Sequence, residues 1–102
     1  IFSDDIYEKL TYGVEFATLA GVEPRLKDRT VTMNGCSKAY AMTGWRIGFA
    51  GAPARLIKAM DKLQSQSTSN TSSISQAAAI EALVEPQQTV APMRVVYQRQ
   101  LA

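Results

Sequence analysis

The sequence predicts an α/β fold, and the order of its apolar segments is the main reason. Residues 1–4, 30–33 and 47–50 are short apolar or β-branched runs bounded by turn-forming or acidic residues, which is typical of buried strands. In the second half of the chain, apolar residues recur at helical spacing. Strands therefore come first and helices follow, in a chain of 102 residues that is long enough for one domain at most.

Short helical turns are expected between the first two strands. The acidic pair that ends the first strand can cap a helical turn over residues 6–10. Residues 14–20 have a weak extended or irregular pattern. Pro24 then stands near the start of one further short helical turn.

Three helices are predicted after the third strand. Pro53 suits the first turn of one helix, and the polar run 65–73 predicts a loop with a serine that caps the next. This second helix, residues 74–84, is rich in alanine and apolar on most sides, so we expect it to be well buried and to end at Pro86. Pro92 fits best near the start of the third. The apolar stripes are Leu56, Ile57, Met60 and Leu63 in the first helix and Val90, Met93, Tyr97 and Leu101 in the third.

The composition is that of an ordinary globular protein, with 46% hydrophobic residues, 20% charged residues and a net charge of +2. This charge is too small, and the basic residues too scattered, to indicate a nucleic acid or an anionic membrane as a partner. No apolar run approaches the roughly 18–20 residues of a membrane span. A single cysteine, Cys36, excludes an internal disulfide and fits a reducing, cytoplasmic compartment. With no histidine in the chain, we expect no metal site.

Both ends of the chain suggest a piece of a larger protein. Ile1 opens an apolar run without an initiator methionine. Residues 98–102 end the last predicted helix without a capping glycine. We therefore expect this chain to be a segment rather than a whole protein.

The most unusual chemistry lies in residues 34–48, where Lys38 follows a predicted strand and Arg46 comes eight positions later. A lysine at the carboxyl end of a buried strand points into the crevice where α/β proteins bind ligands. It can form an imine with a carbonyl cofactor, whereas an arginine matches a phosphate. A surface lysine and an arginine with its head in water are the alternatives. Together, however, the two side chains suit the aldehyde and phosphate ends of one cofactor.

Asp4 and Tyr7 stand at the end of another predicted strand. A carboxylate can keep a pyridine nitrogen protonated, and a phenol can donate a hydrogen bond to a ring oxygen beside an imine. A helix cap and an edge aromatic are the simpler interpretations. The two residues nevertheless supply the remaining polar contacts that the same cofactor needs.

Two segments resemble class I pyridoxal-phosphate-dependent aminotransferases. The run GCSKAYAMTGWRIG, residues 35–48, is similar at every position to the cofactor-attachment motif of that family. The run SDDIYEKL, residues 3–10, resembles the family segment that contacts the pyridine nitrogen and the ring hydroxyl. The amino-acid sequences of residues 39–48 and 63–70 are most similar to those of bacterial aspartate aminotransferases. The resemblance covers residues 1–83 and fades after Glu85.

The resemblance implies a role for each of four residues. Lys38 would be the catalytic residue, bound to pyridoxal 5'-phosphate as a covalent aldimine and moving the proton between substrate and cofactor. Asp4 would pair with the pyridinium, Tyr7 would hydrogen-bond the ring oxygen, and Arg46 would bind the cofactor phosphate. The family's further phosphate contacts and its substrate-carboxylate arginine would lie outside this chain.

The resemblance also implies a fold and an activity. The fold would be that of the large domain of fold-type-I enzymes, a mostly parallel sheet flanked by helices. Residues 1–85 would form the later half of that domain, and residues 86–102 would start the helix that leads to a small domain. The whole protein would transfer an amino group from aspartate or a similar amino acid to a 2-oxo acid such as 2-oxoglutarate, as a homodimer.

Two alternatives remain open from the sequence. The first is another enzyme of the same fold, such as an aromatic or alanine aminotransferase or a lyase. The second is a truncated segment with only a binding or structural role. We expect the isolated 102 residues to bind the cofactor weakly and to be inactive.

Overall fold

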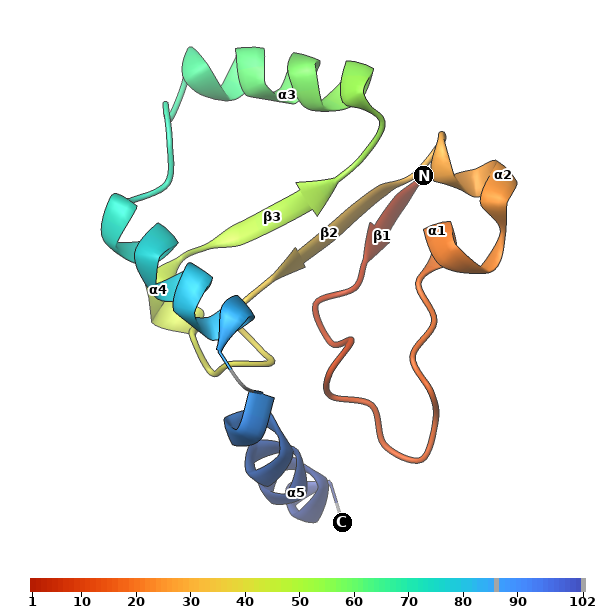
Figure 1. Ribbon diagram of the computed structural model, residues 1–102, viewed down its shortest axis with the longest axis vertical. Coiled ribbons are helices and arrows are strands. Elements are labelled where there is room, and N and C mark those ends of the chain that lie inside the picture. Colours follow the sequence, from red (N-terminus) through yellow and green to blue (C-terminus); the bar gives the residue numbers. More distant parts are fainter. Residues whose placement is uncertain (86, 102) are drawn as a thin grey trace.

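The computed structural model describes residues 1–85 and 87–101, and its centre is a three-stranded sheet (Figure 1). The strands are β1 (Phe2–Asp4), β2 (Val31–Gly35) and β3 (Gly48–Gly51), in the spatial order β1-β2-β3. All three predicted strands are therefore confirmed, with boundaries shifted by one or two residues.

The sheet brings three chain segments to one edge. β1 and β2 are parallel, with Phe2 opposite Val31, so both strands end at the same edge. β3 runs antiparallel to β2, with Gly35 opposite Gly48, so β3 begins where β2 ends. Within the described residues the sheet is therefore mixed, with one parallel and one antiparallel pair. The end of β1, the end of β2 and the start of β3 thus lie together.

Gly35 permits the close approach of β2 and β3 at this edge. A Cβ at this position would lie 3.0 Å from the carbonyl oxygen of Ile47 and 3.2 Å from the Cα of Gly48. Both atoms belong to the backbone, so the strands would have to separate to relieve the contact.

We expect Gly35→Ala to lower the free energy of unfolding of the complete protein by about 1–3 kcal/mol, the usual cost of overpacking. Gly51→Ala on β3 is the matched control, because a Cβ there meets no atom within 4 Å. Denaturant unfolding of both variants is the measurement. Equal free energies of unfolding for the two variants would show that β2 and β3 do not approach each other closely at Gly35.

The helical turn predicted at Pro24 and the three helices predicted after the third strand are present, and three further short segments are helical. The first three α-helices are α1 (Leu19–Val22), α2 (Pro24–Lys27) and α3 (Ala54–Ser65). They are followed by α4 (Ser73–Val84) and α5 (Val90–Gln100). Short 3₁₀ helices precede β3 and α5, namely η1 (Thr43–Trp45) and η2 (Gln87–Thr89).

Three local expectations are corrected. Residues 6–10 form hydrogen-bonded turns instead of a helical turn, with Glu8 N–H donating to the Asp5 carbonyl at 2.9 Å. Pro53 is the N-cap of α3 and not a residue of its first turn. Ser72 occupies the N-cap position of α4, but its side chain makes no capping hydrogen bond. The predicted helix end at Pro86 lies outside the described residues, although α4 does stop at Val84.

The prediction that residues 74–84 are well buried is wrong for this chain. Only Ser75 and Ala79 of α4 are buried, whereas the side chains of Ile74 and Val84 are 71% and 77% exposed. The radius of gyration, 15.3 Å, exceeds the roughly 13 Å of a compact domain of this length. The apolar pattern of α4 indicates a surface that needs a partner, and within residues 1–85 and 87–101 this surface stays exposed.

The two longest helices lie apart from one another. Figure 1 shows α3 across one end of the molecule, and α4 and α5 beside the connection between β2 and β3. None of the helices within residues 1–85 and 87–101 is both long and apolar enough to cross a membrane. Of the three longest helices, α5 lines the candidate site, whereas α4 contacts the loop between β2 and β3 through Ser75.

Candidate active site

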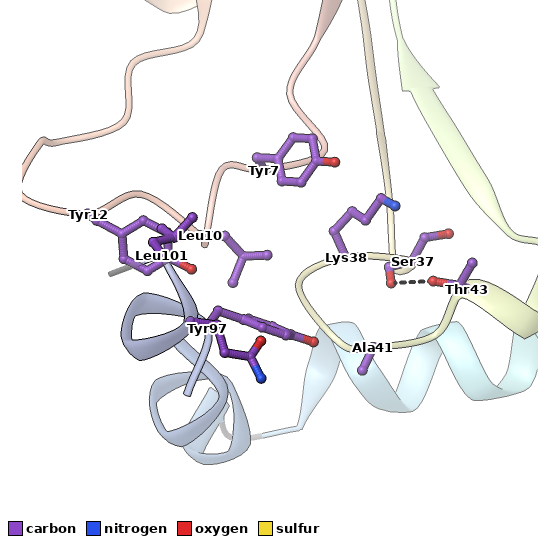
Figure 2. Close-up of a pocket in the computed structure, with 10 residues that line it drawn as sticks. Tyr7, Leu10, Tyr12, Ser37, Lys38, Ala41, Thr43, Tyr97 and Leu101 are labelled. Carbon is purple, nitrogen blue, oxygen red and sulfur yellow. Dashed lines mark hydrogen bonds between the residues drawn. The ribbon is translucent and has the colours of Figure 1, made fainter. Parts of the chain in front are cut away.

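A cavity of about 530 Å³ opens at the edge of the sheet where β1 and β2 end (Figure 2). It is bounded by the turn after β1, the loop between β2 and β3, and helix α5. This volume lies in the range of small-molecule and cofactor sites, about 300–1,000 Å³. Its lining residues are Tyr7, Leu10, Tyr12, Ser37, Lys38, Ala41, Thr43, Tyr97, Gln100 and Leu101.

Lys38 and Tyr7 are brought together by the parallel pairing of β1 and β2. Lys38 lies three residues beyond β2, on a turn over residues 37–40, and its side chain is half-buried. Tyr7 lies three residues beyond β1, and 56% of it is exposed. In Figure 2 the Tyr7 hydroxyl points toward the Lys38 side chain. The arrangement places an amine and a phenol in one cavity.

Asp4 lies at the same edge but does not line the cavity. It is the last residue of β1, and its exposed carboxylate accepts a hydrogen bond from the Ile6 backbone N–H at 3.2 Å. The neighbouring Asp5 is buried and accepts a hydrogen bond from the Ser3 hydroxyl at 2.7 Å. Of the two adjacent carboxylates, Asp4 is therefore the one free to face a ligand, and Asp5 holds the strand end in place.

Arg46 lies just before β3 with a left-handed backbone, φ 52°. This conformation is uncommon for a residue with a side chain, and it turns the chain from η1 into the strand. The guanidinium donates from Nη1 to the carbonyl of Thr43 at 3.1 Å. Since Thr43 lines the cavity, Arg46 is anchored at its border, although Arg46 is itself exposed and is not a lining residue.

Cys36 is close to Lys38 in sequence but is unsuited to nucleophilic chemistry. Its side chain is fully buried, and this desolvation raises the pKa of the thiol above its ordinary value. The thiolate, which is the reactive form, is therefore disfavoured at neutral pH. Among the described side chains of this loop, Lys38 carries the amine that lines the cavity.

The sequence did not indicate that α5 forms one wall of the cavity. Tyr97 and Leu101 line it, whereas their helical spacing in the sequence predicts only an apolar face of a helix. The helix is attached to the loop after β1, because Arg94 donates from Nη2 to the carbonyl of Thr11 at 2.9 Å. This contact joins residues 83 positions apart, and nothing in the local sequence indicates it.

Comparisons with known proteins establish the family of this chain but do not test the site residues. A sequence profile described as "Aminotransferase class I and II" matches residues 1–101. The aspartate/prephenate aminotransferase of Cereibacter sphaeroides is 57% identical over 100 residues, which are 97% of this chain and 25% of that protein. The aspartate aminotransferase of Geobacillus stearothermophilus is 52% identical over 102 residues, which are 99% of this chain and 26% of that protein.

Two solved structures that resemble this chain are aminotransferases as well. The crystal structure of the aspartate aminotransferase from Rhizobium meliloti superimposes with a TM-score of 0.92 and 56% identity, covering 96% of this chain and 25% of that one. The aromatic aminotransferase from Pyrococcus horikoshii superimposes with a TM-score of 0.89 and 37% identity, covering 96% of this chain and 27% of that one. The chain thus spans about a quarter of the length of the relatives it matches. The predicted fold and family are confirmed, and the chain belongs to the class I and II aminotransferases.

Proposed function

We propose that this chain is the lysine-bearing part of a pyridoxal-phosphate-dependent aminotransferase. The observation that carries the proposal is the convergence of Lys38, Tyr7, Asp4 and Arg46 at one edge of the sheet. These residues come from two segments, the end of β1 with the turn after it and the loop between β2 and β3, which are separated by more than twenty residues. Each residue has chemistry suited to a different part of one cofactor.

The residues present fit this cofactor. The cavity holds the Lys38 amine, which can attach an aldehyde, next to the Tyr7 hydroxyl, which can donate a hydrogen bond to a ring oxygen. The exposed carboxylate of Asp4 ends the adjacent strand and suits a protonated ring nitrogen. Arg46, at the border of the cavity, suits a phosphate.

Each side chain would perform one task. Pyridoxal phosphate, when bound, supplies an electron sink for charge that develops on the substrate α-carbon. Lys38 Nζ would hold the aldehyde carbon and, when released, move a proton at the substrate α-carbon. The Asp4 carboxylate would keep the ring nitrogen charged, and the Tyr7 hydroxyl would orient the ring. Arg46 would bind the phosphate with its guanidinium fork.

The proposal extends to the whole protein. Residues 1–85 would be the later half of the large cofactor-binding domain, and residues 86–102 would lead toward a small domain. The protein would be cytoplasmic and would act as a homodimer on an amino acid and a 2-oxo acid. The exposed apolar side chains of α4 support the view that further protein covers this helix.

We propose aspartate as the amino donor and 2-oxoglutarate as the acceptor, because relatives named aspartate or aspartate/prephenate aminotransferase are 52% to 57% identical to this chain. The test uses the complete enzyme with 2-oxoglutarate and, in parallel, aspartate, alanine or phenylalanine as donor. We expect glutamate formation to be fastest with aspartate. A preference for phenylalanine would favour the second candidate below, and a preference for alanine would contradict both candidates. Absence of transfer with every donor would contradict the proposed reaction.

An aromatic donor is the second candidate. Three tyrosines, Tyr7, Tyr12 and Tyr97, line the cavity that contains Lys38. A structure described as an aromatic aminotransferase superimposes on 96% of this chain. Aromatic side chains pack favourably against one another, so this lining is compatible with an aromatic substrate. The donor series above distinguishes the two candidates.

A further inference from the structure

We propose that α4, together with Gln87 of the η2 segment that follows it, positions the lysine loop, residues 36–46, by contacting it at two separate points. The role assigned to the loop rests on the proposed function, but the contacts themselves do not. Ser75 holds the end of the loop next to Arg46, and Gln87 holds the turn that carries Lys38. Ser75 and Gln87 are positioning residues in this proposal, because neither lines the cavity.

The loop is weakly held by its own backbone. The N–H groups of Tyr40 and Met42 both donate to the Cys36 carbonyl, at 3.3 and 3.4 Å. The N–H of Ala41 donates to the Lys38 carbonyl at 3.2 Å. These distances lie at or beyond the upper end of the usual range, about 2.7–3.2 Å. Contacts from outside the loop are therefore needed to fix the turn.

The backbone of the loop is also strained. Ala41, which lines the cavity, has a left-handed conformation with φ 53°, and Arg46 has φ 52°. Residues with a side chain adopt this conformation only where the surrounding structure imposes it. Burial of Cys36 and Ala39 fixes one side of the loop. The two contacts with α4 and the residues after it fix the other.

The first contact is made inside α4. Ser75 is buried, and its hydroxyl donates to the carbonyl of Trp45 at 2.8 Å. Trp45 ends η1 and directly precedes Arg46. The hydrogen bond therefore fixes the peptide that sets the direction of Arg46.

The second contact is made just beyond the end of α4. The Tyr40 hydroxyl donates to Gln87 Oε1 at 2.6 Å. The same glutamine amide donates from Nε2 to the carbonyls of Ala82 and Glu85, at 3.1 and 2.8 Å. Gln87 is thereby tied to the carboxyl end of the helix. Through these hydrogen bonds, Gln87 connects the carboxyl end of α4 to the turn that carries Lys38.

The two contacts together fix the separation of Lys38 and Arg46. Ser75 lies in the first turn of α4, and Gln87 lies just after its last turn. A helix of this length is a rigid spacer with a rise of about 1.5 Å per residue. The residues proposed to bind the aldehyde and the phosphate are thus held against one element. Supporting contacts of this kind are what precise binding sites require.

The experiment uses the complete enzyme without cofactor, so that its result does not depend on catalysis. Tyr40→Phe and Gln87→Leu each remove one partner of the second contact, and the double variant removes both. Backbone hydrogen exchange of residues 40–42 and the acetylation rate of Lys38 relative to the exposed Lys58 on α3 are measured by mass spectrometry. Gln88→Leu, at the exposed neighbouring position of η2, is the matched control.

We expect both measured quantities to rise about 2–10-fold in each single variant, the factor that corresponds to one hydrogen bond. The double variant should show no further increase, because the two side chains share one contact. Gln88→Leu should leave both quantities unchanged. In the enzyme with cofactor, kcat should fall while KM for the amino acid stays constant, as expected for a misplaced but still accessible lysine.

The first contact is tested in the same way. Ser75→Ala should raise hydrogen exchange of residues 45–47 but not of residues 40–42, with the exposed Ser73→Ala as its control. Unchanged exchange and acetylation in Tyr40→Phe and Gln87→Leu, or fully additive effects in the double variant, would overturn the proposal. Failure of the enzyme to transfer amino groups would contradict the proposed function alone, because the exchange results would stand.

Discussion

Lys38→Ala should abolish covalent attachment of pyridoxal phosphate to the complete enzyme. The half-buried amine lines the cavity, and the thiol of Cys36 in the same loop is fully buried. Loss of the group that attaches the cofactor and moves the proton should lower kcat by at least about 10⁴-fold. Intact mass after borohydride reduction measures the attachment, and steady-state kinetics measure the rate.

The matched control for this prediction is Lys58→Ala. Lys58 is exposed on α3, which Figure 1 shows at the far end of the sheet from α5. This variant should retain both the attached mass and the activity. If Lys38→Ala still carried the cofactor covalently, another lysine would be the point of attachment and the proposed site would be wrong.

Asp4→Asn should affect catalysis and Asp5→Asn should affect stability, although the two residues are adjacent. Asp4 is exposed at the end of β1, and we expect its loss to lower kcat by about 10²–10³-fold, the usual cost of removing one electrostatic contact to the reacting group. Asp5 is buried and accepts a hydrogen bond from the Ser3 hydroxyl. Its loss should lower the free energy of unfolding by about 1–2 kcal/mol and leave kcat unchanged.

The measurements are kcat with the preferred donor and denaturant unfolding, both on the complete enzyme. A loss of activity in Asp5→Asn with normal activity in Asp4→Asn would show that Asp5, and not Asp4, contacts the cofactor. Equal losses in both variants would indicate that the end of β1 acts as a unit, and the specific role of Asp4 would be rejected.

Much of the local structure could be predicted from the sequence. The three strands and the helices at 54–65 and 73–84 follow from apolar spacing and from glycine and proline positions, which act over a few residues. The motif at residues 35–48 identified the family, and that identification is confirmed. The proposed roles of Lys38 and Arg46 remain predictions.

Features that depend on distant parts of the chain could not be predicted. The antiparallel pairing of β3 with β2 depends on where the connecting loop turns, and the left-handed backbone of Arg46 is part of that turn. The burial of α4 was predicted wrongly, because an apolar pattern shows that a surface needs a partner but not whether the partner is present.

The sequence by itself determined which chemical groups this protein has and, to within a few residues, where its three strands and three longest helices lie. Only the tertiary structure decided that Lys38 and Tyr7 share a cavity, that Tyr97 of α5 closes it, and that Gln87 holds Tyr40. The reason is physical. Secondary structure reflects neighbours in the chain, whereas a site is built by strand pairing and side-chain contacts between segments that are far apart in sequence.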